Sequence, residues 1–91
     1  MTDYSKYSDD EINDKMHMHL KEENYLYPGY FYTSDRGLCM DILINNKFEF
    51  IPLEDGYEVR TYDHNGKPII AQNKNPFRAI CECYLMQKEG S

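Results

Sequence analysis

Two short turn motifs constrain the fold of this chain most strongly. Asp55-Gly56 and Asn65-Gly66 each separate two stretches in which apolar and polar residues alternate or β-branched residues gather. Dipeptides of this kind form the tight turns that join neighbouring antiparallel strands. The segments 47–53, 57–62 and 67–72 are therefore predicted to form an antiparallel meander.

A further apolar segment, LCMDILI at 38–44, precedes the meander. A run this short does not by itself distinguish a strand from a helical turn. Ile42 and Ile44, followed by Asn45-Asn46, favour a strand that enters a turn. The sheet is accordingly expected to have three or four strands.

An amphipathic helix is predicted before the sheet, at about 9–22. Ser8 and Glu11 have the spacing of a capping box, which satisfies free backbone N–H groups at the start of a helix. Apolar residues recur every fourth position, which places them on one face of the helix. These residues are Ile12, Met16 and Leu20.

A second helix is predicted after the sheet, because Asn75 is a good N-cap and Pro76 suits the first helical position. Its apolar stripe consists of Phe77, Ile80, Cys81, Tyr84 and Leu85. Two amphipathic helices need an apolar surface on which to pack, and an antiparallel sheet provides one. We therefore expect an α+β sandwich in a single compact domain, 1–91, with 1–7 and 89–91 flexible.

The composition excludes several classes of protein. No apolar run approaches the length that spans a bilayer, and the polar, acidic N-terminal residues do not resemble a signal peptide, so a cytoplasmic protein is expected. Cys81 and Cys83, like His17 and His19, lie two residues apart in predicted helices, where side chains diverge, so they are predicted to be structural rather than metal ligands. No phosphate-binding loop or nucleophile motif is present, and neither a cofactor nor an enzymatic activity is predicted.

The stretch YLYPGYFYT at 25–33 is the strongest candidate for a binding surface. The chain has nine tyrosines and no tryptophan, and tyrosine is enriched at protein interfaces because it combines a large ring with a hydroxyl. One face of the stretch is expected to anchor it to the sheet, and the other to contact a partner. The candidate contact residues are Tyr25, Tyr27, Tyr30 and Tyr32.

The net charge of −6 predicts repulsion from free nucleic acid, since phosphate contacts dominate that affinity. An acidic surface could instead meet basic grooves that normally hold nucleic acid. The residues expected to form it are Asp10, Asp14, Glu54 and Asp55.

Both ends of the chain resemble one family. DYSKYSDDEIN at 3–13 is similar to the opening of the NinX-like small phage proteins, and NPFRAICECYLMQKE at 75–89 is similar to their closing helix. The resemblance implies a compact phage-encoded α/β sandwich located in the host cytoplasm. The family has no established activity, but small acidic phage proteins without catalytic motifs often inhibit host machinery by binding it.

The leading hypothesis is therefore a monomeric inhibitor that binds a host defence nucleoprotein complex, such as a type I CRISPR surveillance complex, and blocks its engagement of nucleic acid. A second hypothesis is an accessory protein that binds nucleic acid itself through basic residues in or near the last hairpin. These residues are Arg60, Lys67, Lys74 and Arg78. A third is a homo-oligomeric structural protein that uses the tyrosine stretch as its own interface.

Overall fold

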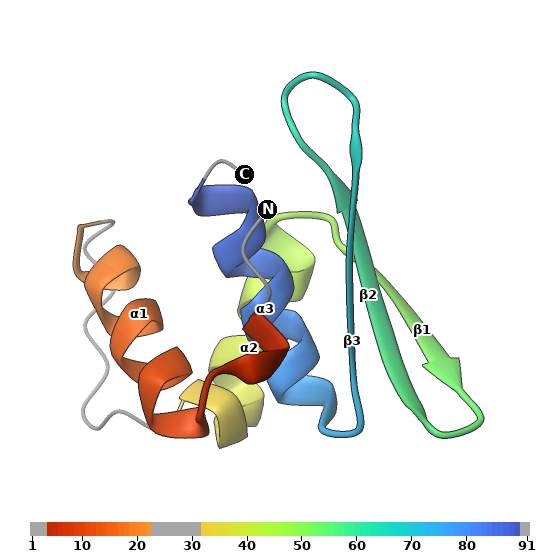
Figure 1. Ribbon diagram of the computed structural model, residues 1–91. Coiled ribbons are helices and arrows are strands. Elements are labelled where there is room, and N and C mark those ends of the chain that lie inside the picture. The colour runs from red at the N-terminus through yellow and green to blue at the C-terminus, as the bar shows by residue number, and fades with distance from the viewer. Residues whose placement is uncertain (1–3, 23–31, 90–91) are drawn as a thin grey trace.

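The structure, a computed structural model, describes residues 4–22 and 32–89 (Figure 1). Four elements precede the sheet, namely the 3₁₀ turns η1 (Tyr4–Lys6) and η2 (Tyr32–Ser34) and the helices α1 (Asp9–Glu22) and α2 (Arg36–Asn45). The strands β1 (Glu49–Leu53), β2 (Gly56–Tyr62) and β3 (Pro68–Asn73) follow, and α3 (Pro76–Lys88) comes last. The predicted α+β class is confirmed.

The three strands form an antiparallel sheet in the order β1-β2-β3, as the two turn motifs predict. Phe50 pairs with Val59, and Val59 pairs with Ala71, so these three side chains share the inner face of the sheet. The helices all lie on this inner side (Figure 1), and α3 packs directly against β2 and β3. The opposite face of the sheet is turned away from the helices.

The helix α3 lies between the sheet and α1 and is buried on nearly all sides (Figure 1). Its predicted stripe is confirmed at Ile80, Cys81, Tyr84 and Leu85, which are buried, whereas Phe77 is half-buried. A helix that is covered all round belongs to the centre of a core rather than to its surface. The central position of α3 also buries two charged residues, Arg78 and Glu82, which the stripe does not include.

Both predicted helix starts are confirmed by their caps. The Ser8 N–H donates to Glu11 Oε1 at 3.0 Å, and the Glu11 N–H donates to Ser8 Oγ at 3.2 Å. At the start of α3, the Asn75 side chain accepts a hydrogen bond from the Phe77 N–H at 3.0 Å. Since caps act within a few residues, the sequence alone locates them.

The prediction of a strand at 38–44 is wrong, because this segment belongs to the helix α2. The Asp35 side chain caps the helix by accepting a hydrogen bond from the Leu38 N–H at 3.0 Å. Leu38 and Ile42 are buried while Ile44 is 65% exposed, which is a helical pattern and not the alternation of a strand. The Ser-Asp-Arg-Gly sequence at 34–37 supplies the cap.

The parts of 1–7 and 89–91 that the structure describes make specific contacts, and their expected flexibility stays a prediction. Tyr4 is buried, and its hydroxyl donates a hydrogen bond to Glu89 Oε1. The other carboxylate oxygen of Glu89 lies 3.0 Å from His19 Nε2 and 3.5 Å from Lys15 Nζ. The first turn, α1 and the end of α3 are thereby held together by one carboxylate.

Two glycines are expected to respond to alanine substitution in opposite ways. Gly37 lies in the first turn of α2, where a Cβ would make ordinary contact, so Gly37→Ala should stabilise the fold by up to about 1 kcal/mol through its higher helix propensity. At Gly56 a Cβ would lie 2.8 Å from the backbone oxygen of Asn73, so Gly56→Ala should destabilise by about 1–3 kcal/mol. Urea unfolding of the two variants measures both effects, and a stabilised Gly56→Ala would contradict this register of β2 and β3.

Candidate functional site

The outer face of the sheet is one candidate site, because no described helix covers it (Figure 1). Alternation and register assign three side chains of each strand to this face. They are Glu49, Ile51 and Leu53 from β1, Glu58, Arg60 and Tyr62 from β2, and Pro68, Ile70 and Gln72 from β3.

Large apolar side chains are exposed on this outer face. Tyr62 is 58% exposed, Leu53 and Ile70 are also exposed, and Ile51 is half-buried. Single exposed apolar residues are ordinary, but several on one open sheet face mark a surface suited to contact with another molecule.

A buried carboxylate lies in the middle of this face. Glu58 is only 5% exposed although no helix covers it. Gln72 Nε2 donates to Glu58 Oε1 at 2.6 Å, and Arg60 Nε donates to Glu58 Oε2. The side chains of Arg60 and Gln72 therefore screen the carboxylate from water and are themselves held in place by it.

These hydrogen bonds, that of Gln72 first and that of Arg60 second, hold the pKa of Glu58 below its ordinary value of 4.5. A carboxylate with a lowered pKa in the folded state stabilises the fold above the unfolded pKa and loses this effect as the pH falls through the folded pKa. Stability should thus decline below about pH 4.5, and Glu58→Gln should reduce that decline. Thermal melts at stepped pH between neutral and acid measure the decline in both proteins. An unchanged acid dependence in Glu58→Gln would contradict a lowered pKa of Glu58 in the folded state.

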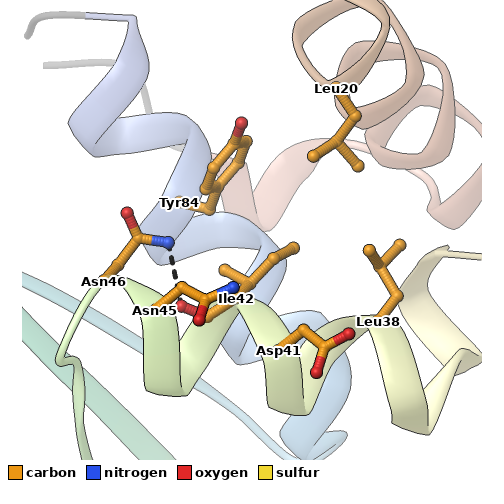
Figure 2. Close-up of a pocket in the computed structure, with 7 residues that line it drawn as sticks. All are labelled: Leu20, Leu38, Asp41, Ile42, Asn45, Asn46 and Tyr84. Carbon is orange, nitrogen blue, oxygen red and sulfur yellow. Dashed lines mark hydrogen bonds between the residues drawn. The ribbon is translucent and has the colours of Figure 1, made fainter. Parts of the chain in front are cut away.

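The helical side of the molecule carries a second candidate, a pocket where α1, α2 and α3 meet (Figure 2). Its volume is about 90 Å³. Apolar side chains from all three helices line it, together with three polar residues of α2 and its C-cap. The lining residues are Leu20, Leu38, Ile42 and Tyr84, with Asp41, Asn45 and Asn46.

Of the tyrosines predicted to contact a partner, only Tyr32 lies in the described part of the chain, and the prediction is wrong for it. Tyr32 is 1% exposed, and its hydroxyl lies 2.8 Å from His17 Nδ1. It packs in the core that α3 shares with η2 and α1, so it is an anchor. Tyr25, Tyr27 and Tyr30 lie outside the described residues.

The four predicted acidic residues are all exposed, but they do not form one surface. Asp10 and Asp14 lie on α1, whereas Glu54 and Asp55 form the turn between β1 and β2. Figure 1 shows α1 and this turn on opposite sides of α3. The expectation of a combined acidic face is wrong, because the central helix separates its two halves.

The four predicted basic residues are also separated. Lys67 and Lys74 flank β3 at its two ends, about 20 Å apart for a strand of this length. Arg60 is engaged with Glu58, and Arg78 is buried. Arg78 contacts Asp9 at 2.6 Å and Glu82 at 2.9 Å, and it donates to the Tyr4 carbonyl at 3.0 Å.

The cysteines are buried, and two of the histidines are hydrogen-bonded within the fold. Cys39, Cys81 and Cys83 are buried, and burial raises the pKa of the Cys83 thiol to about 12, which makes it a poor nucleophile. His17 and His19 are half-buried and hydrogen-bonded, as described above. Within residues 4–22 and 32–89, no cluster of three or more potential ligands could hold a metal ion.

None of the helices in the described ranges has the length and apolar character needed to cross a membrane.

Comparisons of the chain with protein-family models, with curated proteins and with solved structures found no match. The resemblance of its two ends to the NinX-like proteins therefore stays a prediction.

Proposed function

We propose that this protein acts by binding another protein stoichiometrically, with the outer face of the sheet as its contact surface. The observation that carries the proposal is the set of exposed apolar side chains, Tyr62, Leu53 and Ile70, around the buried Glu58. Apolar anchors supply most of the affinity of an interface, and a fixed polar group among them supplies orientation. The pairing of Glu58 with Arg60 and Gln72 keeps this face in one arrangement before a partner binds.

The partner that we propose is a nucleic-acid-binding assembly of a host defence system, such as a type I CRISPR surveillance complex. The net charge of −6 supports this choice, because an acidic protein associates faster with a basic groove. Since the acidic residues are spread over the molecule, the charge acts as a long-range field and not as a local patch. The resemblance of the two ends to small phage proteins supports the same choice.

The alternative hypotheses have less support. Direct nucleic-acid binding would need a continuous basic patch, and Arg78 and the two separated lysines do not supply one. A homodimer through the sheet alone would be small, since three strands of this length offer about 300 Å² of face, against about 800 Å² per partner in a stable complex. A contact with a different protein must likewise extend beyond the sheet face to reach this size.

The outer-face variant Tyr62→Ala tests the proposal. The tagged protein is incubated with lysate of the host, captured proteins are identified by mass spectrometry, and the identified complex is then purified and titrated. Tyr62→Ala should weaken binding at least about tenfold, as expected for an interface aromatic, and leave the melting temperature nearly unchanged because the side chain is exposed.

The matched control is Met18→Ala, which removes an exposed apolar side chain from α1, away from the sheet. It should leave affinity unchanged. Equal affinity of Tyr62→Ala and the unsubstituted protein would contradict the role of the sheet face. Failure of the purified complex to lose nucleic-acid binding at one equivalent of protein would contradict inhibition.

A further inference from the structure

The pocket between the helices has the size of one amino-acid side chain. Pockets for cofactors and drug-sized ligands measure about 300–1,000 Å³, whereas a dry cavity of about 150 Å³ already admits a benzene ring. The volume of about 90 Å³ found here is therefore too small for a nucleotide or a flavin. It matches the side chain of a leucine, isoleucine or methionine.

The pocket is apolar at its base and polar along one wall. Leu20 from α1, Ile42 from α2 and Tyr84 from α3 approach it from three sides in Figure 2. Asp41 and Asn45 lie on the α2 side and are exposed. This arrangement is that of a hot-spot pocket, in which an apolar anchor is buried and polar groups surround the entrance.

Asp41 is the one charged residue among the seven that line the pocket. The Asp41 carboxylate forms no ion pair with a basic side chain of the described residues, and none of the seven lining residues is basic. Lys88 lies nearby, with Nζ 5.5 Å from the centre of the Tyr84 ring, but it is not part of the lining. A basic residue next to the inserted side chain would complement Asp41, and an acidic one would be repelled.

The exposed surface of α2 continues from this entrance. Ile44 is exposed and lies three residues after Asp41, so the two side chains are neighbours on the helix. Ile44 therefore offers a further exposed apolar side chain beside Asp41 on α2. The pocket and Ile44 together make a short contact strip rather than an isolated hole.

We propose that the pocket between α1, α2 and α3 is a docking site for one aliphatic side chain of a protein partner, next to a lysine or arginine that pairs with Asp41. The three helices that line this site lie on the inner side of the sheet (Figure 1), so the proposal does not depend on the outer face being a contact surface. It takes a short linear segment with an aliphatic residue beside a basic one.

Synthetic capped dipeptides test the chemistry without knowledge of the partner. Acetyl-Leu-Lys-amide, acetyl-Leu-Glu-amide and acetyl-Ala-Lys-amide are titrated into the methyl-labelled full chain and followed by NMR. The first should shift the methyl signals of Leu20, Leu38 and Ile42, with a dissociation constant of about 1–60 mM. The acidic peptide should bind about two- to fivefold more weakly, the range of one exposed ion pair, and the alanine peptide should give no saturable shift.

Two variants make the test specific. Asp41→Asn should remove the preference for lysine over glutamate, whereas Asp55→Asn, which removes the same charge from the distant β1–β2 turn, should preserve it. Asn45→Trp places a ring at the exposed entrance and should abolish the methyl shifts while the melting temperature stays unchanged.

Three results would overturn the proposal. The first is an absence of shifts at the three methyl-bearing residues at the highest peptide concentration. The second is equal binding of the lysine and glutamate peptides. The third is tighter binding of benzyl alcohol than of any peptide, because this would indicate a small-molecule site. Each can occur whether or not Tyr62→Ala weakens capture of a host complex, so the two proposals fail independently.

Discussion

Replacement of Arg78 by methionine is expected to destabilise the protein by about 3–5 kcal/mol, a large part of the stability of a domain this size. Arg78 is 8% exposed, and Glu82, its partner one helical turn later, is also buried. Methionine fills similar space but leaves the Glu82 carboxylate buried without its positive charge. It also removes the hydrogen bonds that tie the carbonyls of Tyr4 and Tyr7 to α3.

Differential scanning calorimetry should show the loss as a fall in melting temperature of at least about 12 °C, since 1 kcal/mol corresponds to about 4–8 °C here. The double variant Arg78→Met/Glu82→Met should recover much of the loss, because it removes the unpaired charge as well. Arg36→Met, which changes an exposed arginine of α2, should shift stability by no more than about 0.5 kcal/mol. Equal melting of Arg78→Met and Arg36→Met would show that the buried pair does not hold the fold.

Replacement of Tyr32 by alanine is also expected to cost about 3–5 kcal/mol, because it removes a buried aromatic ring and leaves a cavity. Thiols from two helices lie against the backbone of this residue, with Cys39 Sγ 3.1 Å and Cys81 Sγ 3.5 Å from the Tyr32 carbonyl oxygen. The backbone of Tyr32 therefore lies where η2, α2 and α3 meet. Urea unfolding measures the change.

Tyr32→Phe separates the ring from the hydroxyl. It keeps the packing and loses the hydrogen bond to His17, so it should cost about 1 kcal/mol. Tyr62→Ala, at the exposed tyrosine of β2, is the control and should leave the unfolding midpoint nearly unchanged. If Tyr32→Ala unfolded at the same urea concentration as Tyr62→Ala, Tyr32 would be a surface residue as the sequence predicted.

The sequence predicted the elements whose signals are local. The capping box at Ser8, the Asn75-Pro76 start of α3 and the two turn motifs each act within four residues, and all appear where expected. The helix α2 was not predicted because its buried positions, Leu38 and Ile42, also fit a strand.

The location of the candidate sites depends on contacts between residues that are far apart in the chain. The tyrosine stretch was selected for its composition, but the surrounding core buries Tyr32. The sequence does not distinguish Tyr62 as exposed, because alternation alone does not say which face of a sheet the helices cover. An Arg-Glu pair four residues apart in α3 was a visible signal, yet such pairs are usually solvent-exposed, and only the packing of α1 and the sheet around α3 buries this one.

The sequence by itself thus determined the class of the fold, the two capped helices and the meander, because hydrogen bonds and periodicity within a few residues specify them. The tertiary structure decided which tyrosine is core and which is exposed, why the acidic and basic residues form no single patch, and where the sheet face and the helical pocket lie. Burial and distance depend on which residues far apart in the chain come together around α3, and no local pattern carries that information.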